Sequence, residues 1–236
     1  MTTFKDLGVH SNYIKALKEL EIKIPTEIQE KTIPVLLKTK TDFIGLAQTG
    51  TGKTAAYGLP VLNSIDTNSA VVQALILSPT RELVQQIKKQ LFKFTKFKDE
   101  KIFLEAVYGG EKIEKQMQRL QRPTHVIVAT PGRLIDLIEK GTVNLRSIKT
   151  VVLDEADEML SMGFKKELDA ILNYTSGSRN TWLFSATMPD EILRIISKYM
   201  EPSAVKVSVN KESLVNANIN HQYLITSIKE KTTIVS

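Results

Sequence analysis

One stretch of the sequence decides the fold: Asp42-Phe43-Ile44-Gly45-Leu46-Ala47-Gln48-Thr49-Gly50-Thr51-Gly52-Lys53-Thr54. Its first part, residues 42–46, is a short apolar run of the kind that forms a buried strand. A glycine-rich segment follows, and a new apolar segment begins at Ala55. A strand, a glycine-rich loop and a helix in this order make a P-loop, whose backbone N–H groups bind phosphate oxygens. The stretch therefore predicts a nucleotide phosphate site.

Each part of this loop suits a nucleotide. Gly50 and Gly52 allow successive N–H groups to converge on phosphate oxygens. Lys53 supplies a cation for the β- and γ-phosphates, and Thr54 offers a hydroxyl to Mg²⁺. The strict pattern begins with Gly where this chain has Ala47, a change outside the phosphate cradle. The expected nucleotide-binding residues of the loop are Gln48, Thr49, Gly50, Thr51, Gly52, Lys53 and Thr54. The alternative is a glycine-rich turn that only caps a helix.

Further apolar runs of strand length alternate with segments of helical period. The runs cover residues 74–77, 102–107, 126–129, 151–153, 182–184 and 204–209. Between the first two, residues 81–94 place Leu83, Ile87 and Leu91 on one stripe, which predicts a helix with one buried face. Such alternation predicts an α/β fold with a mostly parallel central sheet and helices on both faces. Ligands of such sheets bind at the carboxyl ends of the strands.

A second strand delivers acidic residues to that edge. The apolar run 148–153 ends in Asp154 and Glu155. Asp154 would hold Mg²⁺, directly or through water, and Glu155 would orient or deprotonate the attacking water. Carboxylates at a helix start are the alternative, because they favour the positive end of the helix dipole. Together with Lys53, the two acids are the candidate catalytic residues for hydrolysis of a nucleoside triphosphate.

Length and composition exclude several classes of protein. The chain has 236 residues and no Cys, which rules out disulfides, thiol nucleophiles and thiolate metal sites. Three scattered histidines make no zinc site. A net charge of +6 and a pI of about 9.3 favour a polyanionic partner. No apolar run spans a bilayer and no signal peptide opens the chain, so we expect a cytoplasmic protein with a monomer as the default state.

With Ala156 and Asp157, the acids spell Asp154-Glu155-Ala156-Asp157, and at this point the chain resembles the DEAD-box family of ATP-dependent RNA helicases. Further family motifs stand in order: Pro79-Thr80-Arg81-Glu82-Leu83, Gly109-Gly110, Thr130-Pro131-Gly132-Arg133 and Ser185-Ala186-Thr187. The resemblance covers essentially the whole chain. It implies a RecA-like P-loop domain, with ATP and Mg²⁺ as cofactors and single-stranded or short-duplex RNA as partner.

Near the N-terminus, residues 24–29 resemble the Q motif by which the family recognises adenine. The resemblance implies that Gln29 reads the adenine edge, Thr26 supports the loop and Phe4 stacks on the base. Thr26 and Gln29 also have the spacing of a capping box, in which both side chains only satisfy helix-end donors. The chain departs from the family at Glu21 and Ile22, where Gly and an aromatic residue are usual, so we expect weaker stacking.

The motifs expected to bind RNA begin helices. Thr80 and Thr130 are placed as N-caps, and Pro131 suits a first helical position. Helix N-termini bind phosphate without reading bases, and arginine forks add affinity that is independent of sequence. The residues implied by the resemblance are Pro79, Thr80, Arg81, Gly109, Gly110, Thr130, Pro131, Gly132 and Arg133. Ordinary helix capping is the alternative for each turn alone. The Lys-rich segment 88–101 is expected to be a solvated surface.

The resemblance also implies a link between hydrolysis and strand separation. In the family, the hydroxyls that correspond to Ser185 and Thr187 bond to the last acid of the acidic motif, Asp157 in this chain. Taken alone, these small residues would only mark the entry to a helix.

Three parts of the chain are expected. Residues 1–30 would be a Q-motif segment packed on the core, 31–209 the ATP-binding domain, and 210–236 a linker with the start of a missing second RecA-like domain. The chain lacks the family's His-Arg-x-Gly-Arg-x-Gly-Arg run, which supplies arginine fingers. We therefore expect an isolated half that binds nucleotide but hydrolyses ATP negligibly, whereas the full protein would couple hydrolysis to local unwinding of RNA duplexes.

Two other functions remain open at this point. One is an RNA clamp that uses ATP as a latch without productive unwinding, and Glu155 argues against it because a permanent clamp needs no water-positioning acid. The other is a DNA translocase of the wider superfamily. The Gln29 motif and Asp157 favour the RNA-acting branch.

Overall fold

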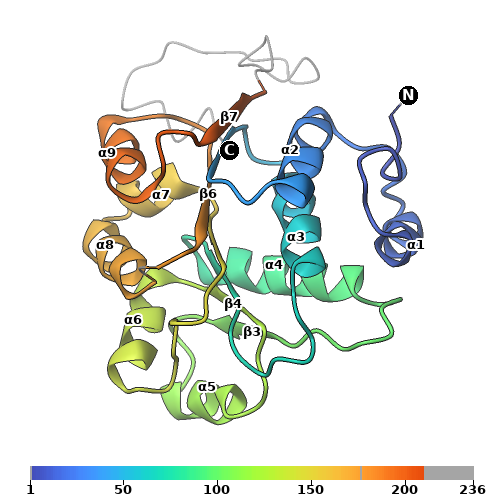
Figure 1. Cartoon of the computed structure of the whole chain (residues 1–236). Helices are drawn as coiled ribbons and strands as arrows, with labels where there is room; N and C mark the ends of the chain where they lie inside the picture. Colours follow the sequence, from blue (N-terminus) through green and yellow to red (C-terminus); the bar gives the residue numbers. More distant parts are fainter. Residues whose placement is uncertain (1, 176, 210–236) are drawn as a thin grey trace, which may run out of the picture.

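A seven-stranded sheet forms the centre of the computed structural model, which describes residues 2–175 and 177–209 (Figure 1). Its strands are β1 (Phe43–Leu46), β2 (Ala74–Leu77), β3 (Leu104–Val107), β4 (Val126–Ala129), β5 (Thr150–Leu153), β6 (Asn180–Ser185) and β7 (Val205–Ser208). Every apolar run identified in the sequence contains or overlaps one of them. The spatial order is β3-β4-β2-β5-β6-β1-β7 and every pairing is parallel, which confirms the predicted α/β class.

Helices connect the strands. In the described residues they are α1 (Ser11–Glu19), α2 (Glu27–Lys38), α3 (Lys53–Asn63), α4 (Arg81–Phe94), α5 (Ile113–Leu120), α6 (Pro131–Glu139), α7 (Ala156–Ser161), α8 (Lys165–Tyr174) and α9 (Asp190–Tyr199). The predicted helix 81–94 coincides with α4, and the Thr80 side chain accepts a hydrogen bond from the Leu83 N–H as its N-cap. None of these helices is long and apolar enough to cross a membrane.

Both faces of the sheet are buried. Successive side chains of a strand point to opposite faces, so Phe43 belongs to one core cluster and its neighbour Ile44 to the other. In Figure 1, α1 to α4 lie to one side of the sheet and α6 to α9 to the other. Phe4, Tyr13 and Leu17 belong to the first cluster, so these residues of the N-terminal segment pack on the core.

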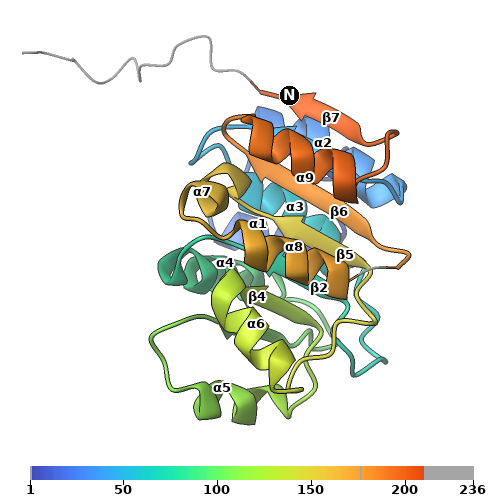
Figure 2. The same ribbon diagram turned by 90° about the vertical axis from the view of Figure 1, so that its left-hand side faces the viewer.

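Parallel pairing brings one set of loops to one edge. Because each helix returns the chain to the opposite edge, every loop from a strand to the next helix opens at the carboxyl ends of the strands. Figure 2 shows the row of parallel strands from β7 down to β4. The motif loops that follow β1, β2, β3, β4, β5 and β6 all lie at this edge. The predicted linker, residues 210–236, lies outside the described residues.

Candidate functional site

The glycine-rich loop, residues 47–52, joins β1 directly to α3. Gly50 and Gly52 have positive φ angles of 76° and 94°, which only glycine adopts without strain. Gly52 is the N-cap of α3, and Lys53 is its first helical residue. The free N–H groups of this helix start, together with the dipole of the helix, favour an anion in front of the loop.

Lys53 lies inside the loop. Lys53 is only 6% exposed, and its Nζ donates a hydrogen bond of 3.0 Å to the Ala47 carbonyl. An ammonium group has three donors. In the described residues Ala47 is its only hydrogen-bond partner, so two donors can serve phosphate oxygens.

The two acids follow β5, which β6 separates from β1 in the sheet. Asp154 is 6% exposed, and burial raises the pKa of its carboxyl to about 6, although nearby Lys53 lowers it. Glu155 has a φ of 54° at the N-cap of α7. A non-glycine residue in this left-handed region costs about 1–3 kcal/mol, a strain that is common at functional sites.

Sequence reasoning missed Tyr57. Its buried hydroxyl donates a hydrogen bond of 2.9 Å to Asp154 Oδ2. Burial raises the pKa of Tyr57 well above its usual value, and the neighbouring carboxylate raises it further, so the hydroxyl stays a donor. This bond fixes one oxygen of Asp154 and leaves the other for a different partner.

The residues present fit Mg²⁺. Asp154 Oδ1 is buried and has no hydrogen-bond partner in the described part of the chain. Mg²⁺ prefers oxygen ligands and binds through one or two carboxylates together with substrate phosphates. No group of three or more His, Cys, Asp or Glu that could hold a metal alone occurs in residues 2–175 and 177–209. Asp154 and Thr54 would therefore hold the ion jointly with a nucleotide.

Gln29 and Thr26 contact the P-loop. Gln29 Nε2 donates a hydrogen bond of 3.0 Å to the Gly52 carbonyl, while its Oε1 accepts one of 3.0 Å from the Thr26 N–H. The Thr26 hydroxyl donates to the Thr51 carbonyl at 2.8 Å. Both halves of the capping box are present, and the Thr26 hydroxyl also supports the loop through its bond to Thr51. Adenine recognition by Gln29 stays a prediction.

Phe4 is 3% exposed and packs in the first core cluster. A ring that is so fully buried offers little face to a base, so its burial does not favour the stacking role. Ile22 is half-buried and packs against the same cluster. Glu21 has a φ of 59°, the conformation that explains why glycine is usual at this position.

The candidate RNA residues gather around the loop after β3. Gly109 and Gly110 are exposed, as is Arg81, whose guanidinium lies 5.1 Å from the centre of the Tyr108 ring. Arg133 Nη1 donates a hydrogen bond of 2.8 Å to the Glu111 carbonyl. The remaining members are less accessible, because Pro79 and Pro131 are buried and Thr80, Thr130 and Gly132 are partly buried.

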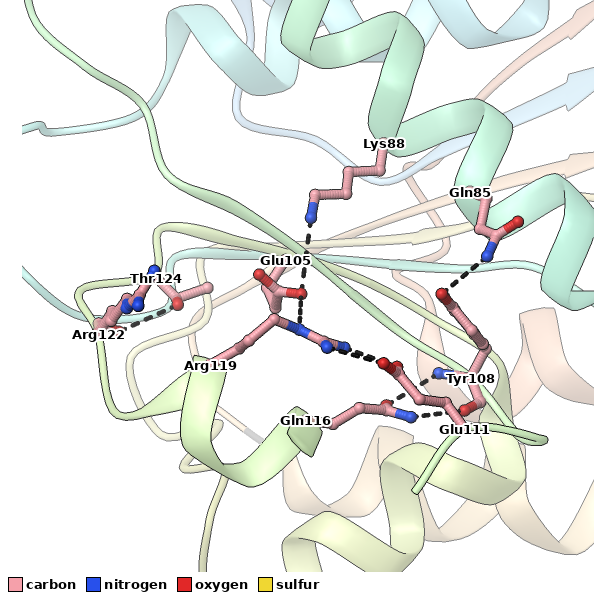
Figure 3. A network of polar contacts seen from close by, with 9 residues as sticks. All are labelled: Gln85, Lys88, Glu105, Tyr108, Glu111, Gln116, Arg119, Arg122 and Thr124. Atoms are coloured by element: carbon pink, nitrogen blue, oxygen red, sulfur yellow. Dashed lines mark hydrogen bonds and ion pairs between the residues drawn. The ribbon is translucent and has the colours of Figure 1, made fainter. Parts of the chain in front are cut away.

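A polar network under this loop was also missed (Figure 3). Arg119 forms two hydrogen bonds to the Glu111 carboxylate, of 2.9 and 2.7 Å, and one of 2.8 Å to Glu105. The Gln116 side chain bonds to both the N–H and the carbonyl of Tyr108. The bonds from Arg119 lower the pKa of Glu111, which keeps the pair ionised at neutral pH.

The acidic motif is connected to the loop after β6. The Thr187 N–H and hydroxyl donate to Asp157 Oδ2 at 2.9 and 2.7 Å. Burial raises the pKa of Asp157, but the bonds from Thr187 leave it below its usual value. Ser185 Oγ forms no well-formed hydrogen bond within the described residues. The Thr187 contact expected from the resemblance is present.

Known proteins are similar to this chain over its whole length. The DEAD-box ATP-dependent RNA helicase CshA of Geobacillus kaustophilus is 47% identical over 100% of this chain, and that of Streptococcus pneumoniae is 44% identical over 97%. The chain spans only 50% and 43% of these relatives. The crystal structure of a DEAD box protein from Methanococcus jannaschii matches with a TM-score of 0.82 at 36% identity, covering 100% of this chain and 62% of that one.

The family comparison agrees with the arrangement of the motifs. The DEAD/DEAH box helicase model matches residues 26–195. These residues include the P-loop, the acidic motif and the motifs that follow β2, β3 and β4. This chain belongs to the DEAD/DEAH box helicase family.

Proposed function

We propose that this chain is the ATP-binding half of an ATP-dependent RNA helicase. In this proposal it binds adenine nucleotide with Mg²⁺ and also binds the sugar-phosphate backbone of RNA. The observation that carries the proposal is that Lys53 and Asp154 are both buried at the carboxyl edge of one parallel sheet. The exposed Arg81 and the half-buried Arg133 lie in the first turns of α4 and α6, at the same edge of the sheet.

Each residue has a specific task at the nucleotide. Lys53 would hold the β- and γ-phosphates, while Thr54 and Asp154 would hold Mg²⁺. Bound Mg²⁺ neutralises the charge that develops on the transferred phosphoryl group. Glu155 would orient the attacking water and accept its proton. Tyr57 would keep Asp154 turned so that Oδ1 faces the site.

Hydrolysis and RNA binding would be coupled through the Asp157–Thr187 contact. Asp157 lies in the first turn of α7, directly after the catalytic acids, and Thr187 lies in the loop after β6. A shift of the acidic motif on loss of the γ-phosphate would therefore move the loop after β6. The RNA contacts would be with phosphates, giving affinity that depends on salt and little on sequence.

The whole protein would contain a second RecA-like domain, consistent with relatives about twice as long as this chain. That domain would close over ATP and RNA and supply arginine fingers, which are worth about 10³- to 10⁵-fold in rate. This chain alone would bind nucleotide yet hydrolyse ATP negligibly. A cytoplasmic location and a monomeric state belong to the same proposal.

The test is Mg²⁺-dependent binding of a fluorescent ADP, competed with unlabelled ADP and then with GDP. We expect ADP to compete and GDP to compete poorly. Lys53→Ala should abolish binding of both ADP and GDP, because it removes the cation of the phosphate site; this variant is the control for that site. Wild-type protein that binds no nucleotide would refute the proposal.

Gln29→Glu tests adenine recognition separately. Glutamate keeps an oxygen for the Thr26 N–H but loses the amide donor. If Gln29 reads adenine, the preference for ADP over GDP should disappear. If Gln29 only supports the P-loop, both nucleotides should weaken equally and the preference should remain.

A further inference from the structure

The loop that joins β3 to α5 contains two adjacent glycines. Gly109 and Gly110 are exposed, and Gly110 has a φ of 83°. Glycine loses more conformational freedom on ordering than any other residue. A defined shape for this loop therefore requires contacts from the residues on either side of the glycines, Tyr108 and Glu111.

Both flanking residues are held from α5. Two nitrogens of the Arg119 guanidinium donate hydrogen bonds to the Glu111 carboxylate (Figure 3). A third hydrogen bond, to Glu105 on β3, anchors the guanidinium to the sheet. The Gln116 amide holds Tyr108 at its backbone. The Arg119, Glu111 and Glu105 side chains are only 33%, 25% and 14% exposed. A two-bond arginine–carboxylate pair that is partly shielded is stronger and more directional than a solvated one.

The same two flanking residues support the candidate RNA-binding arginines. Arg133, on α6, donates to the carbonyl of Glu111. Arg81, on α4, lies over the ring of Tyr108. The Gln85 amide, one turn along α4, bonds to the Tyr108 hydroxyl at 2.7 Å. Two arginines from different helices thus contact opposite ends of one short loop.

We propose that the Glu111–Arg119 pair is a brace that positions this loop for RNA, and with it the guanidinium groups of Arg81 and Arg133. Glu111 and Arg119 are positioning residues in this proposal, which rests on the proposed binding of RNA. With the brace formed, the arginines are already ordered when RNA arrives. Without it, their ordering has to accompany binding, which lowers affinity.

Glu111→Ala separates the brace from simple electrostatics. Removing a carboxylate beside a polyanion site strengthens attraction for RNA by charge alone. Losing the brace has the opposite effect and weakens RNA binding. We expect a loss of about three- to tenfold in RNA affinity, the size of effect that goes with re-ordering two arginine side chains. The matched control is Glu114→Ala, which removes an exposed carboxylate of the first turn of α5. It should bind RNA no more weakly than wild type.

The assay is fluorescence polarisation of a labelled oligouridylate at low ionic strength, with the whole chain. Arg119→Lys keeps the charge but loses the two-bond grip, and should weaken RNA binding as Glu111→Ala does. The double variant should be no weaker than the worse single variant, because both remove one interaction. Fluorescent ADP affinity and the melting temperature measured for each variant should stay near wild type.

Two other results have different meanings. Equal or tighter RNA binding by Glu111→Ala, with normal folding, would overturn the brace. Parallel loss of RNA binding, ADP binding and melting temperature would overturn it too, because the pair would then serve only stability. Failure of the wild-type chain to bind RNA, while ADP binds, would instead refute the RNA part of the proposed function.

Discussion

Tyr57→Phe removes one hydroxyl and leaves Asp154 Oδ2 buried without its donor. A hydrogen bond to a charged group contributes about 1.5–3 kcal/mol. Asp154 is mostly ionised at pH 7.5, because burial raises its pKa only to about 6. We therefore expect the free energy of unfolding to fall by about 1.5–3 kcal/mol at this pH. For a chain of this size, that corresponds to a melting temperature lower by about 3–12 °C.

The pH dependence follows from the same contact. The raised pKa means that the folded state holds the Asp154 proton more tightly than the unfolded state does. The contribution of the Asp154 carboxyl to the free energy of unfolding is therefore fully present below pH 3.8 and is lost as pH rises through about 6. At pH 5 the carboxyl is mostly neutral, and the hydroxyl then makes an ordinary hydrogen bond worth about 0.5–1.5 kcal/mol. The penalty of Tyr57→Phe should shrink accordingly.

Tyr13→Phe is the matched control. Tyr13 is as buried as Tyr57, but its hydroxyl has no hydrogen-bond partner in the described residues. The same deletion should leave stability unchanged or raise it, because it removes an unsatisfied polar group. Urea denaturation of both variants without nucleotide measures the difference directly. Equal effects at the two tyrosines, or an effect of Tyr57→Phe that does not change between pH 7.5 and 5, would refute the reasoning.

Three further predictions concern the same edge of the sheet. Mg²⁺-dependent ADP binding should weaken as pH falls below about 6, where Asp154 becomes protonated, and calorimetry at several pH values would show it. Thr187→Val should raise the pKa of Asp157 toward its usual value, which NMR titration would detect. The free energy of unfolding of this variant should then fall less than that of wild type as the pH is lowered. Gly52→Ala should lower the melting temperature more than Gly50→Ala does. Both glycines have positive φ, but only a Cβ added at Gly52 would meet a neighbour, Gln29 Nε2 at 2.4 Å.

The sequence predicted the strands well because each is a short apolar run that ends at a polar or glycine-rich segment. The spatial order of the strands could not be obtained in this way. β1 lies between β6 and β7, which are far from it in the chain. Periodicity shows which residues are buried but not which strand lies beside which.

The missed residues of the site share a physical reason. Tyr57 lies in an apolar helical segment, and its partner Asp154 is 97 residues away. A tyrosine in such a segment is typical of a core, and only the folded chain places its hydroxyl on a carboxylate. Arg119 looks like one of many surface charges until its bonds to Glu111 are seen. Phe4, which the resemblance assigns to the base, lies within the first core cluster, and its stacking role stays a prediction.

The parallel arrangement also determines where this protein can be modified without harm. Each loop from a helix to the next strand lies at the amino ends of the strands, away from every motif. The loop of residues 64–73 is one of these, and Asn68 is exposed within it. Since the chain has no Cys, Asn68→Cys would create a single thiol for a dye or a surface tether. A reporter attached there would leave the opposite edge open, so nucleotide and RNA could be studied together on one immobilised molecule.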